Sequence, residues 1–350
     1  MHSTTVPAMT TEKRKVQLTG GSTLIISLPI KWVREVGINP GDEVFITPQL
    51  DRSLLMTTAP KTKEQMYETT IKLFPDESPE NNLRILIAHY LVGYDIIKLI
   101  SQKGFGASDR KWIKDAVRKR LIGLEVIEES QNELILQSLL NYHDLPLTKT
   151  MQSMSRIISS MQEDAMQALR DNDTDLAQDI IQRDDEVDRF YLLIIRQLKA
   201  AIEDVQLSEK IGLAHPRECL GYRLIVKSME RIGDHAEKIA RNIIKMDCSV
   251  DNIDQICKMG DMAHDVFTRA ITSLSRKDMK EANDVITDAE KVVAMGISIS
   301  KENNIDCDMT DISFILESLR RIAEYGADIA EISINLNTEE LRSSRKLLKS

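Results

Sequence analysis

The hydrophobic pattern separates a strand-like N-terminal segment from a long helical one. Polar and apolar residues alternate over 14–18, and an apolar run over 22–28 follows a glycine pair and ends at Pro29. A period of two, broken by glycine and proline, is typical of strands and turns. We predict a hairpin whose second strand is buried, then a short helix that begins near Pro29 and ends at Gly37.

A second hairpin is predicted from the apolar segments 43–47 and 53–57, which follow the turn-forming sequence Asn-Pro-Gly-Asp. A β unit of about 45 residues is too small to bury both of its faces well. This pattern favours dimerisation of the N-terminal unit.

The next segment, 61–146, has a mixed character. Apolar residues at helical spacing predict one long helix; they are Leu83, Ile87, Leu91, Tyr94, Ile97 and Ile100. A basic helix is predicted over 109–120, and Gly104-Phe-Gly106 between the two is interpreted as a helix-stop turn. Segments 124–128 and 134–139 predict a hairpin. No chemical motif marks this connector.

After Pro146 the steps of three and four between apolar residues predict helices almost throughout. Six are expected: 148–171, 173–206, 214–247, 251–275, 278–302 and 309–337. The segment 230–240 recurs as 320–330, with Arg231, Ile232, Ile239 and Ala240 matched by Arg321, Ile322, Ile329 and Ala330. Because each copy has an apolar face that it cannot bury alone, the repeat predicts two three-helix bundles in tandem.

Charge is unevenly distributed along the chain. The formal net charge is −9, yet residues 1–60 hold six Lys or Arg against five Asp or Glu. An acidic body is a poor non-specific partner for nucleic acid, so DNA contacts are expected only from the N-terminal segment. The cysteines Cys219, Cys248, Cys257 and Cys307 form no CxxC pair, which is typical of reduced thiols. With neither a signal peptide nor a membrane-length apolar run, we expect a cytoplasmic protein.

Two acidic pairs are the main candidates for chemistry. Glu230 and Asp234 are four residues apart in one predicted helix, and Asp184 and Asp188 have the same spacing in the helix before it. Residues at this spacing share a helix face. The four carboxylates form either a solvated acidic face or an all-oxygen site for a hard or octahedral cation.

The sequence offers little support for catalysis. Helical di-iron enzymes use paired acid-x-x-His motifs, but only Asp261 and His264 have this spacing in the helical core, without a twin. No phosphate-binding loop or nucleophile motif is recognisable. His235 points away from its neighbour Asp234 and is interpreted as a surface or interface residue, and His215, His264 and Cys257 as structural. We therefore expect a protein that is not an enzyme.

Two segments resemble known families. Residues 14–44 resemble the AbrB-type swapped-hairpin domain, and Glu230-Arg-Ile-Gly-Asp234 matches the acid-xxx-Asp motif of PhoU, the phosphate-uptake regulator. The combination resembles archaeal regulators that fuse the two. It implies a mainly α protein with a small N-terminal β domain. The parts would be a disordered arm (1–11), a dimeric AbrB-like β-barrel (12–60), an α/β connector (61–146), PhoU bundles (147–248 and 249–340) and a tail (341–350).

The PhoU resemblance also implies metal ions, such as iron, zinc or another divalent metal. The ligands carried over are Asp184, Asp188, Glu230 and Asp234. The second repeat matches poorly, because Arg320 and Glu324 replace the acid and the Asp, while the fifth helix offers Asp288 followed four residues later by Val292. We expect one metal site and one degenerate or lost site.

The implied function is phosphate homeostasis, with negative regulation of phosphate uptake. The resemblance implies a homodimer that docks on a phosphate ABC transporter ATPase or a phosphate sensor kinase and binds DNA through its AbrB-like domain. The expected DNA contacts are Lys13, Arg14, Lys15, Lys31 and Arg34. Two alternatives remain open: a transcription factor that senses another signal, and a dimeric adaptor that does not bind DNA.

Overall fold

The structure is a computed structural model that describes residues 11–48, 53–58, 66–73, 78–140, 145–246, 253–302 and 309–347. The chain divides into two compact units, Met1–Gln65 and Met66–Ser350. Almost all of the predicted N-terminal arm, and also Cys248 and Cys307, lie outside the described residues.

The N-terminal unit contains the two predicted hairpins and the short helix between them. Its elements are β1 (Gln17–Thr19), β2 (Thr23–Ile25), α1 (Ile30–Val36), β3 (Phe45–Pro48) and β4 (Leu54–Thr57), with both strand pairs antiparallel. Gly37 ends α1 with φ of 79°, as expected for a helix C-cap.

The prediction of a buried second strand was wrong for the single chain. Leu24 of β2 is 68% exposed, and Leu18 opposite it is 65% exposed. The described part of the unit consists of two separate two-stranded sheets without a closed barrel. In the described part of the unit, most apolar residues of the hairpins are therefore exposed.

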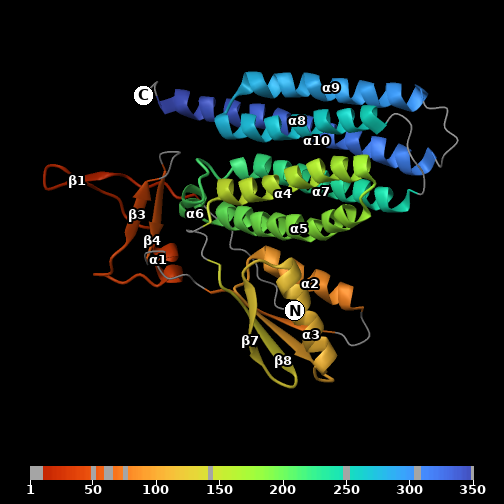
Figure 1. Ribbon diagram of the computed structural model, residues 1–350. Helices are drawn as coiled ribbons and strands as arrows, with labels where there is room; N and C mark the ends of the chain where they lie inside the picture. Colours follow the sequence, from red (N-terminus) through yellow and green to blue (C-terminus); the bar gives the residue numbers. More distant parts are fainter. Residues whose placement is uncertain are drawn as a thin grey trace. The chain divides into compact units, whose positions relative to one another are not determined.

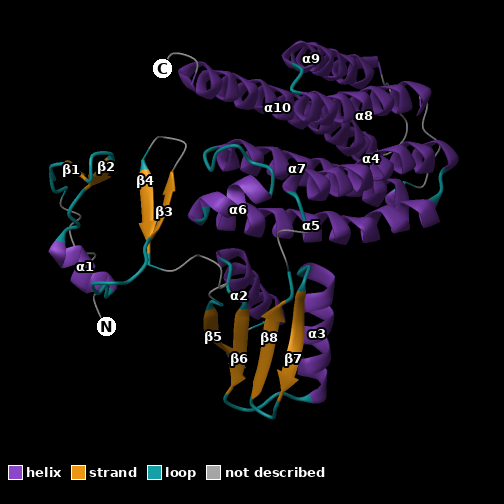
Figure 2. Cartoon of the chain, turned by 90° about the vertical axis from the view of Figure 1, so that its left-hand side faces the viewer, coloured by secondary structure: helices purple, strands orange, loops and turns teal. Residues whose placement is uncertain are grey.

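The larger unit begins with an α/β domain. Its elements are β5 (Glu68–Leu73), α2 (Pro79–Val92), β6 (Ile96–Ser101), α3 (Ala107–Arg120), β7 (Leu124–Glu129) and β8 (Glu133–Ser138). The sheet order is β5-β6-β8-β7, with β5 and β6 parallel and the other pairs antiparallel (Figure 2). Alternate residues of β6 and β8, such as Leu99 and Leu136, form a core with α2 and α3. The predicted hairpin is confirmed as β7–β8.

The long helix predicted through Ile100 was wrong. Helix α2 ends at Gly93, which has φ of 109°, and β6 follows immediately. Ile97 and Leu99 are buried while Lys98 between them is half-exposed, so this segment has a period of two. The Gly104–Gly106 segment likewise does not stop a helix, because it connects β6 to α3 and Gly106 is the N-cap of α3.

The rest of the chain confirms the six predicted long helices. They are α4 (Leu147–Asp171), α5 (Thr174–Glu203), α7 (Glu218–Lys245), α8 (Ile253–Arg276), α9 (Met279–Glu302) and α10 (Met309–Leu347), and a short α6 (Val205–Lys210) follows α5 (Figure 1). Asp204 ends α5 and starts α6, because its side chain accepts hydrogen bonds from the backbone N–H groups of Gln206 and Leu207. Helix α10 runs ten residues beyond the predicted end.

The two repeats have the same turn between their first and second helices. Asn172 and Lys277, which are 105 residues apart, both have positive φ, of 52° and 56°. The next residues, Asp173 and Asp278, each cap the following helix by accepting two backbone N–H groups. The repeat inferred from 230–240 and 320–330 therefore extends over all three helices of each copy.

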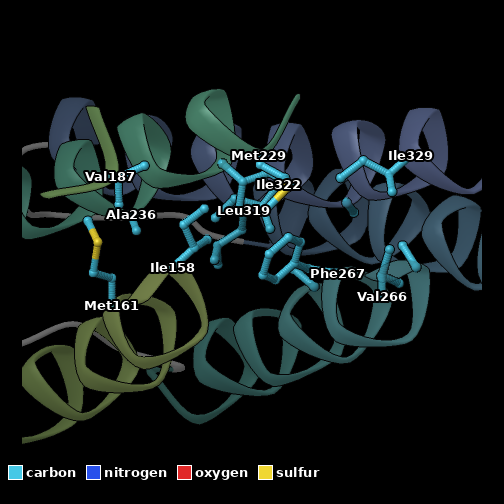
Figure 3. Packing of buried hydrophobic residues seen from close by; sticks show 14 of the residues in the cluster. Ile158, Met161, Val187, Met229, Ala236, Val266, Phe267, Leu319, Ile322 and Ile329 are labelled. Carbon is cyan, nitrogen blue, oxygen red and sulfur yellow. The ribbon is translucent and has the colours of Figure 1, made fainter. Parts of the chain in front are cut away.

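The two repeats share one core. Helices α4, α7, α8 and α10 pack against one another, while α5 lies outside α4 and α7, and α9 outside α8 and α10. Side chains from both repeats, including Ile158, Met229, Phe267 and Ile322, meet in this core (Figure 3). The bundles are therefore fused along an interface rather than merely joined end to end.

Candidate functional site: an acidic cluster between α5 and α7

The structure brings the four predicted carboxylates together where α5 packs against α7. Asp184 and Asp188 lie on α5, and Glu230 and Asp234 lie on α7. Gly233 allows the two helices to approach closely. A Cβ atom there would lie 3.1 Å from Cγ1 of Val187 on α5 and 3.6 Å from Oδ1 of Asp184.

Burial and mutual repulsion raise the pKa values of the aspartates in this cluster. Burial, together with the neighbouring charges of Asp188 and Asp234, raises the pKa of Asp184 to about 7. Burial and the charge of Glu230 raise the pKa of Asp234 to about 6. The pKa of Asp188 is also raised, mainly by burial, although Arg120 opposes this shift. The carboxylates are therefore costly to keep ionised without a cation.

Cations of the chain itself partly neutralise the cluster, and Lys227 and Arg120 bond directly to two of the four acids. Lys227 donates to both oxygens of Glu230 at 2.6 and 2.5 Å, and its Nζ lies 5.2 Å from the ring centre of Tyr191. Arg120, the last residue of α3, donates to Oδ2 of Asp188 at 2.5 Å. The α/β domain therefore supplies a charge to the helical bundle.

The cluster also contains a buried polar atom without a hydrogen-bond partner, Oδ1 of Asp184. Such an atom, in a set of ligands made only of carboxylates, fits a hard or octahedral cation. In the arrangement of the described residues, however, no three His, Cys, Asp or Glu side chains are close enough together to hold an ion. The ligand types therefore fit a cation, while Lys227 and Arg120 occupy two of the four carboxylates.

Sequence reasoning missed several members of the site. Asp185 pairs with Lys119 at 2.6 Å, and Glu237, seven residues after Glu230, adds to the field at Asp184. Glu237 and Lys227 share a helical face with Glu230, so spacing could have found them. Arg120 could not have been found in this way, because it reaches Asp188 only through the packing of α3 against α5.

The second repeat has no equivalent cluster among the described residues. The shared turn aligns Asp184 and Asp188 with Ala289 and Val293. These positions lie one residue after Asp288 and Val292, the pair expected from the sequence. Asp288 instead faces α8, where Arg269 donates to it at 2.7 Å. Arg320 bonds Glu324 at 3.0 Å within α10. The chain's own Arg side chains therefore neutralise these acids.

His235 and His264 lie at contacts between helices. His235 and its repeat-mate Tyr325 meet between α7 and α10 with ring centres 5.9 Å apart, and burial lowers the pKa of His235 to about 4. His264 lies 2.6 Å from Oγ of Ser159, its repeat-mate in α4. Glu163 approaches the same ring nitrogen, Nε2, at 3.6 Å, so the three residues do not form a relay through both ring nitrogens.

The five predicted DNA contacts lie in the N-terminal unit and are exposed. Lys13, Arg14 and Lys15 precede β1, which begins only at Gln17, and Arg14 pairs with Glu12. Lys31 and Arg34 are three residues apart on α1 and share a face. The tripeptide and the helix thus carry two separate groups of cations in a unit of low net charge.

Comparison with known proteins identifies the helical part. The PhoU domain family matches residues 151–243 and 256–333, which include the whole acidic cluster. The chain belongs to the PhoU family. Its N-terminal unit matches a second family, the antidote-toxin recognition MazE bacterial antitoxin, over residues 17–64. An AbrB/MazE-like domain thus precedes the PhoU domain.

Three relatives of this PhoU family member are phosphate-specific transport system accessory protein PhoU homologs. The one from Borreliella burgdorferi is 25% identical over 200 residues, which are 51% of this chain and 86% of the relative. The one from Clostridium acetobutylicum is 24% identical over 185 residues, 50% of this chain and 83% of the relative. The one from Pseudomonas aeruginosa is 25% identical over 213 residues, which are 53% of this chain and 79% of the relative.

Two solved PhoU structures are also similar to the chain. The phosphate transport system regulatory protein PhoU from Streptococcus pneumoniae has a TM-score of 0.49 and 21% identity, covering 56% of this chain and 97% of that one. PhoU from Pseudomonas aeruginosa has a TM-score of 0.47 and 22% identity, covering 54% of this chain and 94% of that one. None of the described helices has the length and apolar character needed to cross a membrane.

Proposed function

We propose that this protein is a phosphate-homeostasis regulator that couples the state of phosphate transport to transcription and restrains phosphate uptake. The observation that carries the proposal is the presence of a PhoU domain and a MazE-like unit in one chain. The relatives are accessory proteins of phosphate-specific transport. In this proposal the PhoU domain docks on a transporter ATPase or a phosphate sensor kinase, and the N-terminal unit binds DNA. An archaeal source stays a prediction.

Exposed apolar residues support a homodimer through the N-terminal unit. Leu18, Leu24, Ile46 and Leu54, one from each strand, are all at least 53% exposed. Apolar side chains exposed to this extent on small sheets are costly to leave in water. A second copy of the unit would cover them and would double the exposed cations available to DNA phosphates.

The test of the DNA part is binding of the full-length protein to fragments from upstream of phosphate-transport genes, measured across a salt series. Replacement of Arg14 and Lys15 by Ala should weaken binding and flatten its salt dependence, because fewer counterions are released. Lys111→Ala with Arg118→Ala on α3 is the matched control, since it removes the same charge from exposed positions elsewhere. Unchanged binding by the first variant contradicts a DNA role for these residues and favours the adaptor alternative.

We further propose that Asp184, Asp188, Glu230 and Asp234 hold a divalent metal such as iron or zinc. The unpartnered oxygen of Asp184 and the raised pKa values of Asp184 and Asp234 support this proposal. A bound cation would neutralise the repelling carboxylates and clamp α5 to α7. Its role would be structural, or it would shape a surface for docking.

A further inference from the structure

The end of helix α3 is held on the acidic side of α5. Arg120 donates to Asp188 at 2.5 Å and lies 3.7 Å from Asp185, while Lys119 pairs with Asp185 at 2.6 Å. The side chains of Arg120 and Asp188 are 36% and 27% exposed, so water partly screens their pair. An ion pair of this exposure is individually weak, so a competing cation could displace it.

The single carboxylate of Asp188 already accepts a hydrogen bond from Arg120. Its neighbour Asp184 has an oxygen without a partner, and both side chains face the acids of α7. A guanidinium and a divalent cation on the same carboxylate would repel each other at close range. A cation bound to Asp188 would therefore weaken the bond that Arg120 makes to its Oδ2.

We propose that Arg120 is a built-in competitor for the cation site, so that divalent cation binding to the acidic cluster releases the C-terminal end of α3 from α5. The inference rests on the cation site proposed above, and adds that the α/β domain senses its occupancy. The remaining contacts of the domain, including the buried Arg196 of α5, keep it attached. The result is a local change at α3 rather than separation of the domains.

Among the described residues, the second repeat has no equivalent of this contact. The equivalents of Asp185 and Asp188 on α9 are Glu290 and Val293. The half-buried Val293 provides no carboxylate for a guanidinium or a cation. Release of α3 would therefore report the state of the first repeat alone.

The test is titration of metal-stripped, full-length protein with Mn²⁺, comparing wild type with Arg120→Ala. Because the variant lacks the competitor, it should bind Mn²⁺ about two- to fivefold more tightly, as expected for loss of one partly exposed ion pair. Arg118→Ala is the matched control, since Arg118 is an exposed residue with the same charge on the same turn. It should bind like wild type.

A second measurement needs no variant. Hydrogen exchange of wild-type backbone amides should become faster in the last turn of α3 when Mn²⁺ is added, and slower in α5 near Asp184. Equal Mn²⁺ affinity of wild type and Arg120→Ala, or unchanged exchange in α3, overturns the competition while leaving the cation site in place. Absence of Mn²⁺ binding to all three proteins overturns both.

Discussion

The two repeats of the helical region share a scaffold and differ in what their outer helices carry. Both use the same turn and helix cap, at Asp173 and Asp278, and both contribute to one core. On α5 the acids of the cluster face α7, and α2 and α3 of the α/β domain pack against the same helix. On α9 the positions that match Asp184 and Asp188 are Ala289 and Val293.

The difference extends along the whole outer helix. Leu192 of α5 packs against the core of the α/β domain, whereas its counterpart Ile297 on α9 is 50% exposed. Arg196 is 1% exposed and bonds the α/β domain, whereas its counterpart Lys301 is exposed. The core residues thus preserve the fold in both copies, while a few residues of α5 that α9 lacks give one copy an acidic cluster and a contact with the α/β domain.

The largest expected effect concerns Arg196. Its guanidinium donates to the backbone carbonyl groups of Tyr90, Gly93 and Tyr94 at the end of α2. Arg196→Met should lower the free energy of unfolding by about 3 kcal/mol, because buried carbonyl groups lose a charged donor. The counterpart Lys301→Met should change it by less than about 0.5 kcal/mol. Urea denaturation measures both, and equal effects would contradict the asymmetry of the repeats.

The next effect is a pH dependence that belongs to the first repeat. Because the folded-state pKa of Asp184 is raised from 3.8 to about 7, proton binding favours the folded state. In chelator-treated protein this contribution is fully present below pH 3.8 and is lost as the pH rises to about 7. Asp184→Asn should flatten this part of the profile and stabilise the protein at pH 8 by about 1 kcal/mol, allowing for partial exposure.

The control for this experiment is Asp284→Asn on α9, where the side chain is exposed. It should leave the profile of unfolding free energy against pH unchanged. If Asp184→Asn instead keeps the parent protein's slope of unfolding free energy against pH between pH 4 and 7, ionisation of Asp184 does not destabilise the folded state.

The smallest effect comes from an ion pair whose polarity differs between the repeats. Arg183 donates to Asp164 at 2.6 Å in the first repeat, and the equivalent positions hold Asp288 and Arg269 in the second. Asp164→Arg with Arg183→Asp copies the second arrangement and should cost less than about 0.5 kcal/mol, whereas Arg183→Asp alone should cost about 1 kcal/mol. A double-mutant cycle that shows no coupling would mean that the two pairs are not equivalent.

Periodicity predicted the long helices because each has a single apolar stripe facing the shared core. It failed at Ile96–Ser101, where Ile97 and Ile100 happen to fit helical spacing although the strand buries alternate residues. It also could not show that Leu24 would be exposed, since exposure of an apolar strand depends on what covers it. The local pattern thus predicted where helices and strands lie more reliably than which of their residues are buried.

The acids of the candidate site were predictable and their partners were not. Spacing and the family resemblance pointed to Asp184, Asp188, Glu230 and Asp234, and the structure brings them together. Arg120 is 68 residues from Asp188, and only the packing of the α/β domain joins them. A short-range pattern contains no information about such a contact.

Metal content is the most direct test of the central claim, that the first repeat alone carries a cation site. Metal analysis of gently purified protein should find at least about one divalent cation per chain. Glu230→Gln with Asp234→Asn should abolish it without changing the far-UV circular dichroism, and Glu324→Gln in the second repeat should not. A metal-free parent protein, or equal metal in the double variant, would contradict the claim and leave an acidic cluster that contacts α3 through Asp188.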